Sequence, residues 1–203
     1  MNTVASTGAI EANERRRPPR QALMIAAVLV AAFAVTWGVI SVASAVSEDD
    51  PSAYIAALGL TRTAVDELPD EIDPSAYGHS GVSAETSHFV GAFDGVRFWV
   101  AENIGSGELC LISKDSVTST GGGGCAPANV LKSSSISFAL VNGTTSYEAF
   151  LIGDAFAGAQ IPSPWVKAGH NLIVVDSEST TGKELTLTSE SASRSLTIRR
   201  FAD

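Results

Sequence analysis

The chain has 203 residues, of which 45% are hydrophobic and 17% are charged, and its formal net charge is −9. This composition fits one globular domain with an added apolar segment and excludes a wholly disordered chain. Residues 1–21 carry a formal charge of +2, which leaves −11 for the rest of the chain. Because this acidic remainder is repelled by phosphate backbones, we do not expect it to bind nucleic acid.

An uncharged apolar run at residues 22–46 is predicted to form a transmembrane helix. As a helix it would extend roughly 38 Å, which is enough to cross a hydrocarbon core of about 30 Å. Arginines precede the run and acids follow it, so the positive-inside rule predicts a cytoplasmic tail at residues 1–21. We therefore expect a single-pass protein of the cell membrane that contacts the lipid bilayer through residues 22–46 and has an extracytoplasmic C-terminal domain.

Cleavage by a signal peptidase is the alternative to a permanent anchor. Ala43-Ser44-Ala45 has the small-x-small pattern of a cleavage site, and a cut after Ala45 would release a secreted protein. The apolar run before Ser41 is longer than the roughly 7 to 15 residues of a cleavable signal peptide. Its length therefore favours the uncleaved anchor.

Residues 47–82 are predicted to form a short juxtamembrane helix and an acidic linker. Asp50 suits an N-cap, Pro51 suits the first helical position, and a break is expected near Gly59. Beyond Pro69, acids, prolines and glycines alternate as in an exposed linker. These acids lack the spacing and the turn glycine of a calcium-binding loop, so we predict no metal site.

From about residue 83 the hydrophobic periodicity changes to two, which predicts an extracytoplasmic β domain over residues 83–203. Asp94-Gly95 and Asn142-Gly143 are typical two-residue hairpin turns. The segments "ELTLT" and "SLTIRR" alternate with apolar residues on one side, and "NLIVVD" suits a buried strand. Seven or eight strands without a long helix indicate an all-β sandwich or open barrel. The predicted pairs are Phe93 with Val96, Gly91 with Phe98, Phe89 with Val100, Leu140 with Thr145, Phe138 with Tyr147, and Ile136 with Ala149.

Cys110 and Cys125 are predicted to form a disulfide bond. An even pair of cysteines oxidises in an extracytoplasmic compartment, and a loop of this size would stabilise the fold by about 3 kcal/mol in the chain-entropy model. Gly121 to Gly124 are expected to form a flexible loop that returns Cys125 to Cys110.

The stretch "DGVRFWVAENIGSGELCLIS", followed by a loop and "GGGGCAP", resembles the ectodomains of a loosely defined group of single-pass membrane proteins from actinobacteria. The resemblance covers about residues 62–160. It implies an anchored, outward-facing domain with Cys110 and Cys125 paired, and it implies no particular activity or cofactor.

One specific kind of enzyme is an alternative interpretation of this sequence. His79, His88 and His170 have no spaced partner, and no metalloprotease or serine-hydrolase motif is present. A membrane-anchored, transpeptidase-like enzyme would instead pair His170 with a free thiol at Cys110 or Cys125. No catalytic residue is predicted if both cysteines are oxidised.

A non-catalytic binding or scaffolding module of the cell envelope is the preferred interpretation, with an envelope or membrane protein as partner. Arg97, Trp99 and Trp165 are the candidate contact residues, because Arg and Trp are enriched in interface hot spots. Trp165 could instead cover the end of the core, and Trp99 could lie beneath another layer. A purely structural spacer is a third possibility.

Overall fold

The structure, a computed structural model, describes residues 50–203 apart from 74–79, 119, 143–144, 192 and 202–203. The predicted cytoplasmic tail, the predicted membrane span at residues 22–46 and the possible cleavage site after Ala45 lie outside these residues. Within them, no helix has the length and apolar character needed to cross a membrane.

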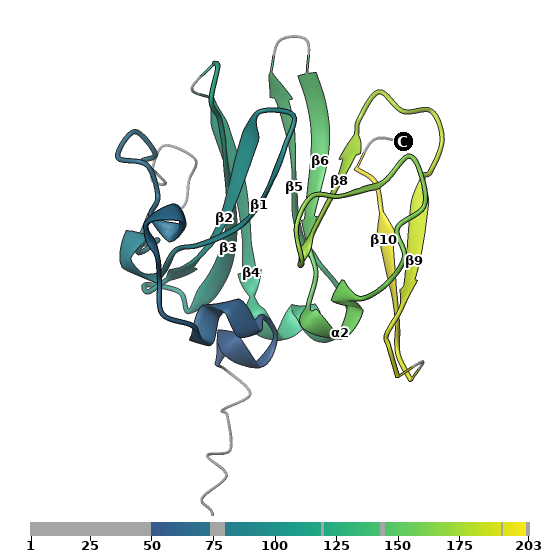
Figure 1. The fold of residues 1–203 in the computed structure, drawn as a ribbon, viewed down its shortest axis with the longest axis horizontal. Helices are drawn as coiled ribbons and strands as arrows, with labels where there is room; N and C mark the ends of the chain where they lie inside the picture. Colours follow the sequence, from purple (N-terminus) through teal and green to yellow (C-terminus); the bar gives the residue numbers. More distant parts are fainter. Residues whose placement is uncertain (1–49, 74–79, 119, 143–144, 192, 202–203) are drawn as a thin grey trace, which may run out of the picture. The chain divides into compact units, whose positions relative to one another are not determined.

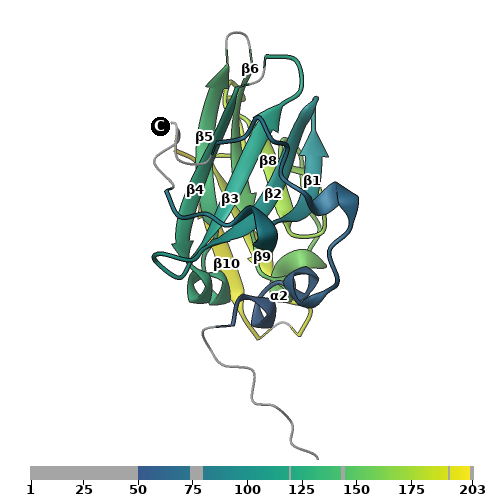
Figure 2. The same ribbon diagram turned by 90° about the vertical axis from the view of Figure 1, so that its left-hand side faces the viewer.

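The described chain is all-β, with three antiparallel sheets and only short helices (Figures 1 and 2). The first sheet, in the order β1-β2-β3-β4, contains β1 (His88–Phe93), β2 (Val96–Asn103), β3 (Glu108–Asp115) and β4 (Gly121–Pro127). The second, in the order β5-β6-β8-β7, contains β5 (Ile136–Asn142), β6 (Thr145–Leu151), β8 (Leu172–Asp176) and β7 (Val166–Lys167). The third is the hairpin of β9 (Glu184–Thr188) and β10 (Ser195–Arg199). The short helices include α2 (Asp154–Ala157) and the 3₁₀ turns η2 (Pro51–Ala53), η3 (Ala56–Gly59), η4 (Ala64–Asp66), η6 (Ala84–Thr86) and η7 (Ala128–Lys132).

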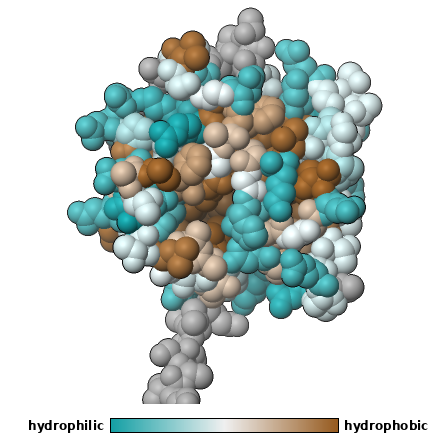
Figure 3. All heavy atoms as spheres, viewed as in Figure 1, coloured by the Kyte–Doolittle hydropathy of each residue, from teal (hydrophilic) through white to brown (hydrophobic). Residues whose placement is uncertain are grey.

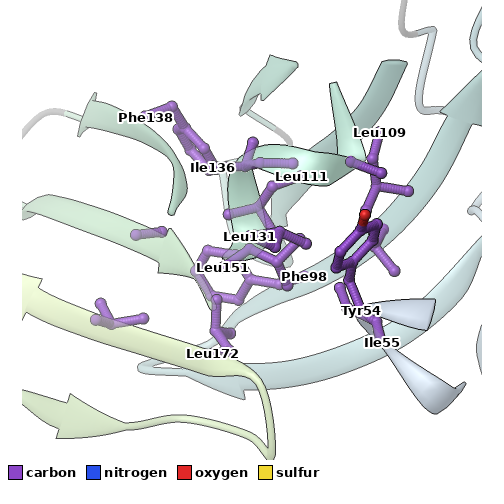
Figure 4. Packing of buried hydrophobic residues seen from close by; sticks show 14 of the residues in the cluster. Tyr54, Ile55, Phe98, Leu109, Leu111, Leu131, Ile136, Phe138, Leu151 and Leu172 are labelled. Carbon is purple, nitrogen blue, oxygen red and sulfur yellow. The ribbon is translucent and has the colours of Figure 1, made fainter. Parts of the chain in front are cut away.

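The second sheet is buried on both faces, so the sheets form successive layers. One face packs on the first sheet, and Leu109 and Leu111 of that sheet share the largest apolar core with Ile136 and Leu151 (Figure 4). The opposite face, which includes Phe150 of β6, packs on the β9–β10 hairpin. The prediction of a buried strand at β8 and of alternating apolar residues on β9 and β10 is confirmed. The hairpin contributes Leu185, Leu187, Leu196 and Ile198.

The first hairpin turns at Asp94-Gly95 as predicted, with positive φ values of 47° and 79°. Pairing of Phe93 with Val96 and of Gly91 with Phe98 is confirmed, but the expected pairing of Phe89 with Val100 is wrong.

A β-bulge at Val90 causes this difference, because one extra residue shifts the register and reverses the faces beyond it. Phe89 therefore lies opposite Trp99, on the outer face of the sheet. Gly91 has a φ of 154°, and a Cβ atom there would lie 2.4 Å from the Ala168 carbonyl oxygen. The glycine permits β1 to approach the segment after β7, where the Ala92 N–H donates to the Ala168 carbonyl.

Figure 3 shows one face of the molecule, on which hydrophobic side chains lie mainly toward the centre and hydrophilic side chains lie around them.

The β5–β6 hairpin forms, but its predicted register is wrong by two residues. Asn142 pairs with Thr145, so Asn142 ends a strand and the connecting residues are 143–144, which lie outside the described residues. A slip of two residues keeps every side chain on the same face, so the alternating pattern cannot distinguish the two registers. The observed pairs that replace the predicted ones are Ile136 with Leu151, Phe138 with Ala149 and Leu140 with Tyr147.

Gly121 to Gly124 belong to strand β4 and not to the predicted flexible loop. They pair in register with β3, and a Cβ atom at Gly124 would lie 2.6 Å from the Ser137 carbonyl oxygen of β5. The glycines therefore serve the close approach of β4 to β5, at the edge where the first and second sheets meet. This strand and the two-residue β7 raise the number of strands among the described residues to ten.

The segment expected to be a juxtamembrane helix and linker packs on the β domain. Asp50 caps η2 as predicted, with its Oδ1 accepting from the Ser52 N–H at 2.9 Å, but 3₁₀ turns replace the α-helix. Tyr54 and Ile55 enter the main core, and Leu68 and Ile72 cover the outer face of the first sheet. Where it is described, this segment packs as a layer on the β domain and is not the exposed linker that the sequence predicts.

Candidate functional site

The two tryptophans predicted to contact a partner are both buried. Trp165 is 4% exposed and packs against Phe150, with ring centroids 5.5 Å apart. Trp99 is fully buried, and its Nε1–H donates to the Val65 carbonyl at 3.2 Å. The alternative roles of these residues, a lid on the core and a position beneath another layer, are the ones that the structure shows.

Arg97 is exposed and lies over the rings of the half-buried Phe89 and the buried Trp99. Its guanidinium carbon is 4.8 Å from the centroid of Trp99 and 5.2 Å from the centroid of Phe89. These two rings meet edge to face at 6.0 Å. The bulge at Val90 is what brings Phe89 to this face, so a local irregularity of β1 builds half of the surface beneath Arg97.

A hollow of about 270 Å³ surrounds this arginine, and we call it the Arg97 pocket. Lys114 lies directly opposite Arg97 in the β2–β3 ladder, and its Nζ is 3.0 Å from the Glu71 carboxylate. The turn at Pro69, closed by a hydrogen bond from the Ile72 N–H, places Glu71 at the rim. The pocket is lined by Pro69, Glu71, Arg97, Trp99, Lys114 and Ser116.

A disulfide bond joins Cys110 and Cys125 beneath the same layer, as predicted. The residues are cross-strand neighbours, with Cα atoms 4.0 Å apart, and Cys110 packs with Trp99 and Ile112. Neither cysteine is a free thiol, so neither can act as the nucleophile of the transpeptidase-like alternative. His170 lies elsewhere, 71% exposed and 3.9 Å from Asp154, and His79 is outside the described residues.

Residues 65–72 cover the outer face of the first sheet, and we call them the covering segment. His88 and Asp66 fasten this segment to the edge strand β1. Burial lowers the pKa of His88, and this effect outweighs the nearby Asp66 carboxylate, which raises it. Burial raises the pKa of Asp66, but hydrogen bonds from the N–H groups of Phe89 and Thr63 lower it by more than burial raises it. The net shift of the Asp66 pKa is therefore downward. The Asp66 Oδ1 accepts from Phe89 at 2.9 Å, which fixes the backbone beside the bulge.

A second hollow of similar volume lies near η2 and α2. Asp154 lines this hollow, and its carboxylate holds neighbouring segments together. Asp154 accepts from the Ala56 N–H and from the Asn171 side chain, each at 2.7 Å. Both carboxylate oxygens are thus used to join three segments. Among the residues that the structure places, no group of three or more His, Cys, Asp or Glu side chains could hold a metal ion.

The sequence named Arg97 as a candidate contact residue but did not indicate that Phe89 and Lys114 lie beside it. Gly91 within a strand is a signal for a bulge, and a bulge there would have moved Phe89 to the face of Trp99. Placing Lys114 opposite Arg97 requires the register of β2 and β3. These strands are joined by a longer turn for which the sequence predicts no turn motif.

Comparison with known proteins finds no family model that matches the chain, no similar curated protein and no similar solved structure. The resemblance to actinobacterial single-pass membrane proteins therefore stays a prediction.

Proposed function

We propose that this chain is a membrane-anchored, extracytoplasmic and non-catalytic module that binds or scaffolds another component of the cell envelope. Residues 22–46 would hold it in the bilayer with residues 1–21 in the cytoplasm, as the charge asymmetry favours. The Cys110–Cys125 disulfide supports an oxidising compartment for the domain.

The observation that carries this proposal is the exposed guanidinium of Arg97 on a fully buried Trp99. A contact residue is most effective when packing holds it in place before binding, because less conformational entropy is then lost. Arg97 has this support from the rings of Phe89 and Trp99. Arginine is also over-represented among the residues that dominate interface energetics.

Crosslinking in living cells, with a C-terminally tagged full-length chain, tests the proposal. We expect one envelope component in near-stoichiometric amount, with its recovery reduced by Arg97→Gln. Arg199→Gln is the matched control, because Arg199 is an exposed arginine on β10 that pairs with Glu184 at 3.4 Å. Recovery of the bait alone contradicts the binding function, and a recovered bait that begins after Ala45 contradicts the anchor.

A further inference from the structure

We propose that the Arg97 pocket recognises an oxyanion, a carboxylate or phosphate group carried by the binding partner. This inference rests on the proposed function and names the chemistry of its contact. It starts from the β2–β3 register, in which Arg97 and Lys114 are direct cross-strand partners. Like charges directly opposite each other destabilise a sheet. Glu71 offsets one of the two cations, and this carboxylate is 73% exposed, so the pocket keeps an excess of positive charge.

The donors of Arg97 are available to a ligand. The guanidinium lies over the rings of Trp99 and Phe89, and no hydrogen bond or ion pair to another described residue uses its N–H groups. A stacked guanidinium keeps its N–H groups at its edge, where the planar fork matches the two oxygens of a carboxylate or phosphate.

The neighbouring positions of the sheet leave Arg97 exposed, whereas the Lys114 side chain is only 13% exposed. Ala92 of β1 lies opposite Arg97, and Gly121 of β4 lies opposite Lys114. No large side chain from these positions in the outer strands fills the space beside the cations. Although the chain is acidic overall, charges more than about 8 Å away are screened at physiological salt. The local cations therefore determine which ligand the pocket attracts.

The indole ring of Trp99 lies 4.8 Å beneath the Arg97 guanidinium carbon, so its N–H signal reports binding at the pocket. We would label the tryptophans of the full-length chain with ¹⁵N, assign Trp99 with Trp99→Phe, and titrate inorganic phosphate and N-acetylalanine at constant ionic strength. We expect a saturable shift of the Trp99 signal and no shift of Trp165. Binding should weaken at least about tenfold in Arg97→Gln, because the bidentate charge-assisted bonds are lost, and should be unchanged in Arg199→Gln.

A response to phosphate alone supports a phosphate-bearing partner, a response to N-acetylalanine alone supports a carboxylate, and a response to both supports a general oxyanion site. No saturable shift with either probe, or equal affinity in Arg97→Gln, overturns the inference. Partner capture separates this failure from failure of the proposed function. A partner captured equally well by Arg97→Gln also overturns the oxyanion site while the binding function stands, whereas absence of any captured partner with the unsubstituted chain contradicts the function itself.

Discussion

Arg97 and Trp99 lie two residues apart on β2 and point to the same face of the first sheet, yet Arg97 is exposed and Trp99 is fully buried. The difference arises from the covering segment, in which Leu68 and Ile72 pack over Trp99. At the pocket this segment contributes Pro69 and Glu71, which line the hollow without closing it over Arg97. In the proposed interaction, Trp99 would therefore act as a support and Arg97 as the contact residue.

Replacement of Trp165 by Ala should destabilise the domain. The side chain is buried against Phe150 in the core between the second sheet and the β9–β10 hairpin, and its loss should lower the free energy of unfolding by about 3–5 kcal/mol. Urea unfolding of the purified full-length chain measures this change. A stable variant with impaired partner capture would instead restore Trp165 as a contact residue.

His88 predicts a pH dependence of stability. Burial holds the pKa of His88 below its ordinary value, so the unfolded state binds the proton more readily than the folded state. The free energy of unfolding should therefore fall as the pH decreases from about 7 to about 5, because this stabilisation is present only above the unfolded pKa.

Unfolding experiments at several pH values test this linkage, with His88→Gln as the comparison. The variant should lose most of the slope in this pH range, whatever its absolute stability. An unchanged slope in His88→Gln would show that other groups are responsible.

The elements of the fold follow local rules where side-chain alternation and turn residues agree. The turn at Asp94-Gly95 was sufficient to predict the first hairpin, and the alternation of apolar residues was sufficient to predict which side of β9 and β10 is buried. The register of β5 and β6 could not be predicted in this way, since a slip of two residues leaves every side chain on the same face of the sheet. The bulge at Val90 and the strand of glycines depend on backbone approaches between segments far apart in the chain, at Ala168 and Ser137, which a one-dimensional pattern does not contain.

Strand β4 offers a test of the glycine explanation. Gly124→Ala would place a Cβ atom 2.6 Å from the backbone oxygen of Ser137, whereas Gly122→Ala meets the terminal methyl of Leu140 at 3.0 Å. A methyl group can rotate away and a paired backbone cannot. We expect Gly124→Ala to destabilise the chain by about 1–3 kcal/mol and Gly122→Ala by clearly less. Equal effects in thermal unfolding would contradict the proposed close approach.

At the scale of the whole molecule, a buried ion pair joins Arg200, the residue after the last strand, to the second sheet. The Arg200 Nε lies 3.1 Å from the Glu148 carboxylate, and the two side chains are 3% and 1% exposed. The remaining N–H groups of Arg200 donate to carbonyls of residues 176–181, and the other Glu148 oxygen accepts from the Phe201 N–H at 2.7 Å. Each buried charge is thus satisfied within one network.

Removal of one member of this pair should be costly, because it leaves the other charge buried without its partner. We expect Arg200→Met to lower the free energy of unfolding by about 3–5 kcal/mol. Arg199→Met, the adjacent control, breaks an ion pair with side chains 79% and 50% exposed and should change it by less than about 1 kcal/mol. Similar denaturation midpoints for the two variants would contradict this role.

Site-specific photo-crosslinking tests the central claim most directly, namely that the molecule binds its partner through the outer face of the first sheet. A photoreactive residue in the full-length chain, placed either at Ser116 on the rim of the Arg97 pocket or at exposed Thr186 on β9, would be activated in intact cells. We predict a defined crosslinked product from position 116 that disappears with Arg97→Gln, and no such product from position 186. The same product from both positions, or a product from position 116 that is insensitive to Arg97→Gln, would contradict the account.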